Sequence, residues 1–195
     1  MDVKRTAIFP TLIYDVDCSH LNYDVLKIFK TTGLTDEDYV WDGDKHDFYV
    51  LSKNKKLIRN IESIVNELLS EIGYVCPFRM TTSWFTYIEP GNRVESHHHC
   101  NSVWSAVFYF YSDCSALIFE KDKPNISVEY KPKNHDLVID GSLGFRAKHG
   151  RMLVFPSHVR HRSDLNETNE NRYSLAMNFM PYGYTKCNDS SFRYR

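Results

Sequence analysis

The sequence lacks several features that would assign it to a special class of protein. Its apolar runs are too short to cross a bilayer, and no hydrophobic segment follows the charged N-terminus. We therefore expect no membrane span and no signal peptide. The 24 basic and 25 acidic residues give a formal net charge of only -1, which argues against duplex nucleic acid as a partner.

Cysteine is also scarce. The five cysteines are odd in number and include no CxxC pair, which argues against a disulfide framework and against a cysteine-rich zinc site. The chain has no internal repeat and no low-complexity tract. We expect an intracellular protein whose residues 1–195 form one domain.

Aromatic residues are plentiful, at 14% of the chain, and they favour β-strands. From residue 78 onwards, short runs of aromatic and β-branched residues alternate with turn residues, a pattern typical of an all-β sandwich or barrel. The expected strands are residues 80–89, 102–111, 115–121, 126–131, 151–156 and 172–181. The polar tail from residue 187 is expected to be loose.

The N-terminal part has a different pattern. It predicts a strand over residues 6–16, a short helix around residues 25–30 and a longer helix over residues 52–72. The longer helix carries one apolar stripe, which needs a sheet to lie on. We therefore predict that residues 1–75 supply a strand and helices that pack on one sheet of a β core formed by residues 78–182.

A histidine triplet follows the Pro90-Gly91 turn. In an extended segment His97 and His99 point to one side, so both imidazoles can bind one metal ion. The third ligand is expected to be His161, with His158 as its competitor. Imidazole suits zinc, copper, iron and nickel alike, and a solvated polar loop is the alternative interpretation.

The strand predicted over residues 172–181 begins with Arg172 and Ser174 on one face. A guanidinium beside a hydroxyl is well suited to bind a carboxylate. The alternative is an arginine in an ordinary surface ion pair.

The order of these blocks resembles the 2-oxoglutarate/Fe(II)-dependent oxygenase superfamily, and in particular its small members in bacteria and tailed phages. The matching blocks are Phe9-Pro10-Thr11, Ser83-Trp84, Pro90-Gly91, His97-His98-His99, residues 105–109, residues 150–157, His161, Arg172-Tyr173-Ser174 and Asn178-Phe179. The resemblance covers most of residues 9–181.

The resemblance implies a mainly β fold, a double-stranded β-helix (a cupin-like jelly roll). It implies Fe(II), 2-oxoglutarate and O2, with hydroxylation of a substrate and decarboxylation of 2-oxoglutarate to succinate. It also implies the cytoplasm of a bacterium or of an infected host cell. The implied iron ligands are His97, His99 and His161, and the implied 2-oxoglutarate contacts are Arg172, Ser174 and either Tyr87 or Tyr109.

One position departs from the superfamily, where a carboxylate follows the first histidine by two residues. Here that position is His99, and Glu95 or the more remote Asp113 could supply a carboxylate instead. Two other functions stay open: a three-histidine cupin-type dioxygenase that does not use 2-oxoglutarate, and a non-catalytic jelly-roll binding module.

The substrate is not readable from the sequence, and a small molecule, a nucleotide and a protein side chain all stay open. Loops over residues 34–48 and 120–150 are expected to select it. The many aromatic residues could also supply a homodimer interface.

Overall fold

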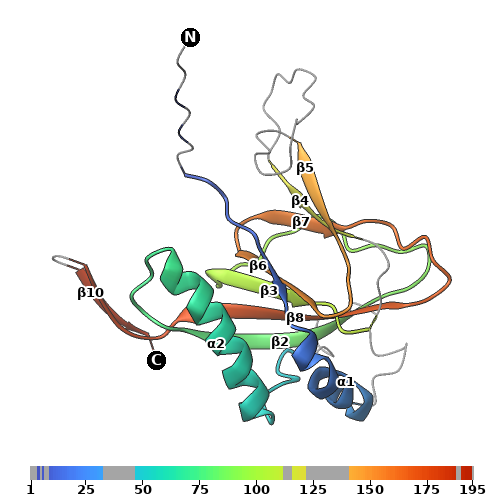
Figure 1. The fold of residues 1–195 in the computed structure, drawn as a ribbon, viewed down its shortest axis with the longest axis horizontal. Helices are drawn as coiled ribbons and strands as arrows, with labels where there is room; N and C mark the ends of the chain where they lie inside the picture. The colour runs from blue at the N-terminus through green and yellow to red at the C-terminus, as the bar shows by residue number, and fades with distance from the viewer. Residues whose placement is uncertain are drawn as a thin grey trace.

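The computed structural model describes residues 4, 6, 9–32, 47–111, 116–121, 141–187 and 190–194. Two facing antiparallel sheets form the body, with the helices outside the larger one (Figure 1). The larger sheet has the order β1 (Tyr14–Asp17), β6 (Arg151–Pro156), β3 (Trp104–Phe108), β8 (Arg172–Pro181) and β2 (Phe78–Ile88). The smaller has the order β5 (Ser142–Arg146), β4 (Ala116–Glu120) and β7 (Arg160–Ser163). This is the mainly β jelly roll that the sequence predicts.

Alternation along the larger sheet divides its side chains between two cores. On β3, Ala106 and Phe108 face the helices, whereas Val107 and the following Tyr109 face the smaller sheet. The side chains between the two sheets therefore come from alternate residues of each strand.

In the described residues before the main β region, the helices are η1 (Ser19–Leu21), α1 (Asn22–Thr31) and α2 (Lys55–Glu71). The buried stripe of α2 consists of Leu57, Ile61, Val65 and Leu69. One turn apart on α2, Glu62 accepts a hydrogen bond from Met80 N–H, and Asn66 bonds both backbone groups of Phe78. The expected packing of the helices on one sheet is thereby confirmed.

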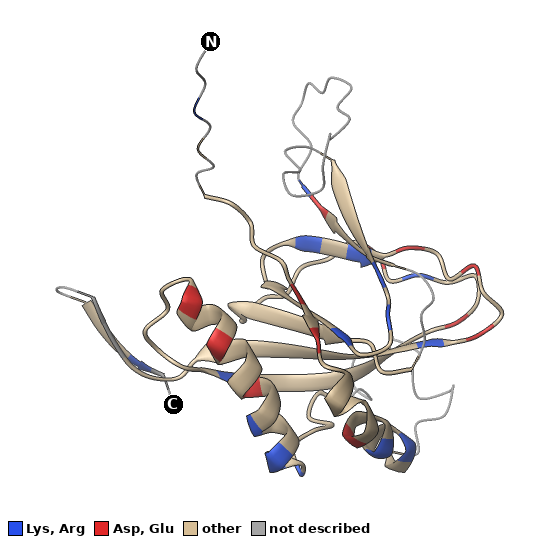
Figure 2. Ribbon diagram, viewed as in Figure 1, with Lys and Arg blue, Asp and Glu red and all other residues tan. Residues whose placement is uncertain are grey.

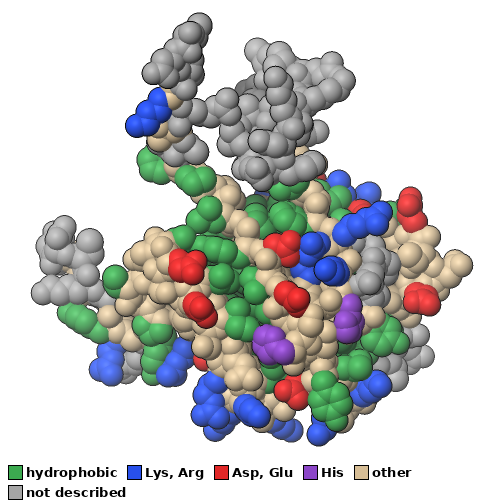
Figure 3. Space-filling model, in the orientation of Figure 1, with side chains coloured by type: hydrophobic (Ala, Val, Ile, Leu, Met, Phe, Trp, Pro, Cys, Tyr) green, Lys and Arg blue, Asp and Glu red, His purple; other side chains and the backbone are tan. Residues whose placement is uncertain are grey.

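The charges of α2 run against its dipole. Basic residues occupy its N-terminal end and acidic residues follow towards its C-terminal end (Figure 2). Since this arrangement opposes the macrodipole, the helix owes its stability to packing. Elsewhere acidic and basic side chains are interspersed on the face shown in Figure 3, in line with the near-zero net charge. No helix among the described residues has the length and apolar character to cross a membrane.

Several elements differ from the sequence prediction. β1 begins only at Tyr14, and the tail forms a hairpin of β9 (Gly183–Cys187) with β10 (Ser190–Tyr194) instead of staying loose. The polar strands β5 and β7 were missed because they have no run of aromatic or β-branched residues. The strand expected over residues 126–131, and most of the two expected substrate loops, lie outside the described residues.

Candidate metal centre

The backbone of the first histidine pairs with that of the last. His97 and His161 form an isolated antiparallel bridge: the N–H of His97 donates to the His161 carbonyl at 3.0 Å, and the return bond measures 2.9 Å. His161 lies on β7, whereas His97 lies on the connection between β2 and β3. Two parts of the chain that are far apart in sequence are thus fixed beside each other.

His99 is held by a different segment. Its N–H donates to the carbonyl of Ser157 at 2.9 Å, in the turn between β6 and β7. Its ring lies 5.6 Å from that of Trp84, which comes from β2. His99 is therefore positioned from the side of the larger sheet.

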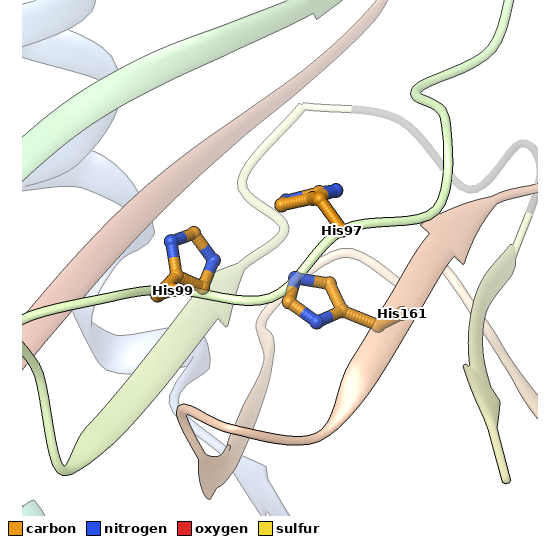
Figure 4. A group of neighbouring side chains, drawn as sticks. All are labelled: His97, His99 and His161. Carbon is orange, nitrogen blue, oxygen red and sulfur yellow. The ribbon is translucent and has the colours of Figure 1, made fainter. Parts of the chain in front are cut away.

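The three imidazoles converge on one point (Figure 4). Ring centroids are 5.2 Å apart for His97 and His99, 4.4 Å for His97 and His161, and 5.1 Å for His99 and His161. One nitrogen from each ring lies within 4.8 Å of the other two. Three donors that share one ion at metal–nitrogen bonds of about 2.1 Å lie about 3.0–3.6 Å from one another, so side-chain movements of about 1–2 Å bring the three nitrogens to one ion.

Backbone carbonyls fix the tautomers of two of these rings. His97 Nδ1 lies 2.8 Å from the carbonyl of Glu95, and His161 Nδ1 lies 2.9 Å from that of Val159. A carbonyl only accepts, so both Nδ1 atoms carry the proton and both Nε2 atoms keep a lone pair. Such outer contacts are the usual means of orienting a metal-binding histidine.

Burial keeps two of the imidazoles neutral. It lowers the pKa of His99 to about 4, with His97 and His98 acting in the same direction. Burial likewise lowers the pKa of His161 to about 3, although the hydrogen bond to Val159 acts in the opposite direction. Since only neutral imidazole binds a metal, both rings are ready to act as ligands at neutral pH.

The site is closed on one side and open on the other. His161 is 2% exposed, and the rings of Phe155 and Phe119 lie 4.8 and 6.2 Å from its ring. His97 and His99 are partly exposed. Three protein donors on one side leave the other side of a bound metal for further ligands, which is the arrangement of a catalytic site.

The other candidate ligands lie away from this point. The carboxylate of Glu95 is 76% exposed and accepts from Arg93 at 2.9 Å, so its carbonyl, and not its side chain, serves the site. His158 is exposed on the turn before β7. Asp113 lies outside the described residues. Within the described part of the chain, the three histidines form the one cluster that could hold a metal.

Arg172 and Ser174 lie on the face of β8 that points between the sheets. They are 3% and 4% exposed, and Tyr173 between them points to the helix side, where Phe29 packs on it. Tyr87 also lies on that helix side, 5.3 Å from Tyr173. The two tyrosines named in the sequence analysis are therefore on opposite faces of the sheet.

Tyr109 lies fully buried between the sheets, on the same side as Arg172. Burial raises the pKa of Tyr109 to about 12, while the charge of Arg172 acts to lower it. The phenol therefore lies within the electrostatic influence of the Arg172 guanidinium.

A family model described as "Putative 2OG-Fe(II) oxygenase" matches residues 82–178, which include all three histidines and Arg172. This confirms the resemblance seen in the sequence. The family implies Fe(II), 2-oxoglutarate and O2, the cofactor and co-substrates expected above. A search of the curated proteins gives no match.

Solved structures share the fold. The epimerase SnoN, in complex with Fe3+, α-ketoglutarate and nogalamycin RO, aligns with a TM-score of 0.59 and 12% identity over 86% of this chain and 78% of its own. Iron-bound HygX from Streptomyces hygroscopicus aligns with a TM-score of 0.54 and 12% identity. The alignment covers 88% of this chain and 83% of HygX.

A 2OG-Fe(II) oxygenase family oxidoreductase from Burkholderia pseudomallei gives a TM-score of 0.46 and 12% identity. The alignment covers 58% of this chain, which spans half the length of that protein.

Proposed function

We propose that this chain, a relative of the 2OG-Fe(II) oxygenases, hydroxylates a substrate that is not yet identified and converts 2-oxoglutarate to succinate. The observation that carries the proposal is the convergence of His97, His99 and His161 at the open end of the jelly roll. The match to the oxygenase family over the same residues supports it.

The donor set fits Fe(II). Imidazole nitrogen is a ligand that this metal accepts, and two of the rings present Nε2 because Nδ1 is occupied by a carbonyl. With three neutral ligands the ion would keep its full positive charge. That charge would favour an anionic co-substrate such as 2-oxoglutarate.

The co-substrate contacts follow from the same face of the sheet. Arg172 and Ser174 would bind the far carboxylate of 2-oxoglutarate, since both point between the sheets. Tyr109 is the tyrosine that we assign to this carboxylate, because it is buried between the sheets, on the same side of the larger sheet as Arg172. Tyr87 is set aside because its ring packs on the helix side.

Bound Fe(II), 2-oxoglutarate and O2 would supply the oxidation of a substrate C–H bond. The residues of the chain would hold these groups and limit the access of water. Phe155 and Phe119 cover His161, and Trp84 covers His99, so apolar rings surround two of the ligands. A small molecule or a protein side chain would reach the metal from the open side, inside the cell.

A three-histidine dioxygenase that does not use 2-oxoglutarate is the second candidate. The observation that favours it is the position of His99, where the superfamily usually has a carboxylate. It gives Arg172 and Ser174 no function, although both are buried on the face of β8 that points between the sheets.

Turnover of 2-oxoglutarate separates the two candidates. We would incubate the protein with Fe(II), 2-oxoglutarate and O2 and measure succinate by mass spectrometry. We expect slow, iron-dependent formation of succinate, reduced at least tenfold in Arg172→Ala. Arg79→Ala is the matched control, since Arg79 lies at the far end of β2 and stacks on Tyr182. Iron-dependent O2 uptake without succinate would favour the second candidate.

A further inference from the structure

Three residues of the blocks that surround the ligands have no assigned role in binding metal or 2-oxoglutarate. Ser105 follows the histidine triplet, Ser157 ends the Phe155-Pro156-Ser157 block, and Asn178 lies near the end of β8. Ser105 and Ser157 are 1% and 0% exposed. The fold brings the three side chains together beside His99.

Their side chains form one continuous hydrogen-bonded chain. The hydroxyl of Ser105 lies 2.8 Å from that of Ser157 and 2.8 Å from the side-chain amide of Asn178. Ser157 in turn donates to the hydroxyl of Ser102 at 2.9 Å, and Ser102 donates to the Trp104 carbonyl at 2.9 Å. These hydrogen bonds join β3, β8 and the turn after β6.

The protons of this chain can be counted. Four contacts run from Asn178 to the Trp104 carbonyl, whereas Ser102, Ser105 and Ser157 carry one hydroxyl proton each. Ser105 donates to Oδ1 of Asn178, Ser157 donates to Ser102, and Ser102 donates to the Trp104 carbonyl. Each of the three protons is thereby used once, and the direction of three contacts is fixed.

The network includes Ser157, the residue that holds His99. The carbonyl of Ser157 accepts from His99 N–H at 2.9 Å, and the N–H of Ser157 donates to the Val103 carbonyl at 3.0 Å. Ser157 is therefore fixed by its backbone and by its hydroxyl. His97 and His161 hold each other through their own bridge, so His99 is the ligand that depends on Ser157.

Packing alone does not call for these hydroxyls. Ser105 is paired with Phe155 in the register of β3 and β6, and an apolar side chain of similar size would need no hydrogen-bond partner there. A buried network of hydrogen-bonded side chains favours one local arrangement over its alternatives. The arrangement selected here is the position of the Ser157 carbonyl.

We propose that Ser102, Ser105, Ser157 and Asn178 form a positioning network that sets the place of His99 in the metal site. The proposal rests on the proposed function to the extent that His99 is taken as a metal ligand. The residues act through His99 and do not touch the metal. Loss of a contact that orients a ligand typically weakens metal binding by about 10- to 100-fold.

The test is a titration of the metal-free full-length protein with Co(II), whose visible d–d bands report the coordination geometry. We expect Ser105→Ala to weaken Co(II) binding about tenfold or more and to change the d–d bands. Ser83→Ala is the matched control, because Ser83 is a buried serine of the same sheet that accepts from Leu51 N–H. Ser83→Ala should unfold at a lower temperature, but its Co(II) affinity and its d–d bands should match those of the wild type.

Ser105→Cys is the milder variant, with a similar volume and only a weak donor, and it carries the comparison if Ser105→Ala does not fold. Wild-type affinity and an unchanged spectrum in the folded variant would overturn the positioning role alone. Failure of the wild type to bind Co(II), or unchanged binding in His99→Ala, would overturn the proposed metal site together with it.

Discussion

The backbones of His97 and His161 are joined by two hydrogen bonds, of 3.0 and 2.9 Å, although 63 residues lie between the two histidines in the sequence. The bridge fixes the relative position of two proposed ligands independently of any metal. A site prepared in this way binds an ion at a lower cost in conformational entropy.

Removal of the most buried histidine should abolish metal binding. We expect His161→Ala to weaken Fe(II) binding by at least two orders of magnitude, because two imidazoles remain. The lost packing against Phe155 should also lower the free energy of unfolding by about 1–3 kcal/mol. Anaerobic calorimetric titration measures the first effect and thermal unfolding the second. His158→Ala, an exposed neighbour, should change neither.

The two tyrosines should behave differently towards 2-oxoglutarate. Tyr109→Phe should weaken 2-oxoglutarate binding to the iron-loaded protein about 10- to 100-fold, as expected for the loss of one hydrogen bond to a charged group. Tyr87→Phe should leave binding unchanged, because its ring packs against Tyr173 on the helix side. Equal effects in the two variants would contradict the assignment of Tyr109.

These tyrosines also mark the limit of prediction from the sequence. The approach of His97 and His99 could be predicted, because the alternation of an extended strand places both on one side. The choice between Tyr87 and Tyr109 depends on whether each side chain points to the helices or to the smaller sheet. In β2 a register shift between Met80 and Thr82 changes which residues point to which side. Strand alternation cannot be counted across such an irregularity.

Contacts made by backbone groups could not be predicted from the sequence either. The carbonyls of Glu95, Val159 and Ser157 orient the three histidines, yet a carbonyl has the same chemistry in every residue. Only the fold decides which carbonyl faces a ring. The serine and asparagine residues of the positioning network belong to blocks that the sequence analysis identified. That their side chains contact one another could not be predicted from the sequence.

Gly150 is a position where a side chain cannot be tolerated. Its φ is +88°, and an added Cβ would overlap Ser19 Oγ and lie 2.9 Å from Ser19 Cα. Its backbone also bonds Cys18 and Tyr109, so it cannot move away. We expect Gly150→Ala to lower the free energy of unfolding by more than 2 kcal/mol, measured by urea denaturation.

Gly73→Ala is the control for Gly150. Gly73 has a φ of +101° with nothing within 4 Å of an added Cβ, so only the backbone conformation is strained. Gly73→Ala should lower the free energy of unfolding by about 1 kcal/mol. Equal costs for the two substitutions would show that Ser19 yields to the added methyl group.

Two cysteines should differ in reactivity. Cys18 is 0% exposed, and burial raises the pKa of its thiol to about 11. At pH 8 the thiol is protonated and inaccessible, so we expect iodoacetamide to spare it in the folded protein and to modify it after denaturation. Cys100 is exposed and serves as the internal reference, detected in the same peptide map. Modification of Cys18 at the rate of Cys100 in the folded protein would contradict the packing around β1.

The most direct test of the account is the visible spectrum of the protein mixed with Fe(II) and 2-oxoglutarate without oxygen. Chelation of Fe(II) by a 2-oxo acid produces a weak charge-transfer band. We predict that the band appears in the wild type, is lost in His161→Ala and needs more 2-oxoglutarate in Arg172→Ala. A protein that binds Fe(II) and shows no band at saturating 2-oxoglutarate would contradict the proposed co-substrate and leave the three-histidine dioxygenase in its place.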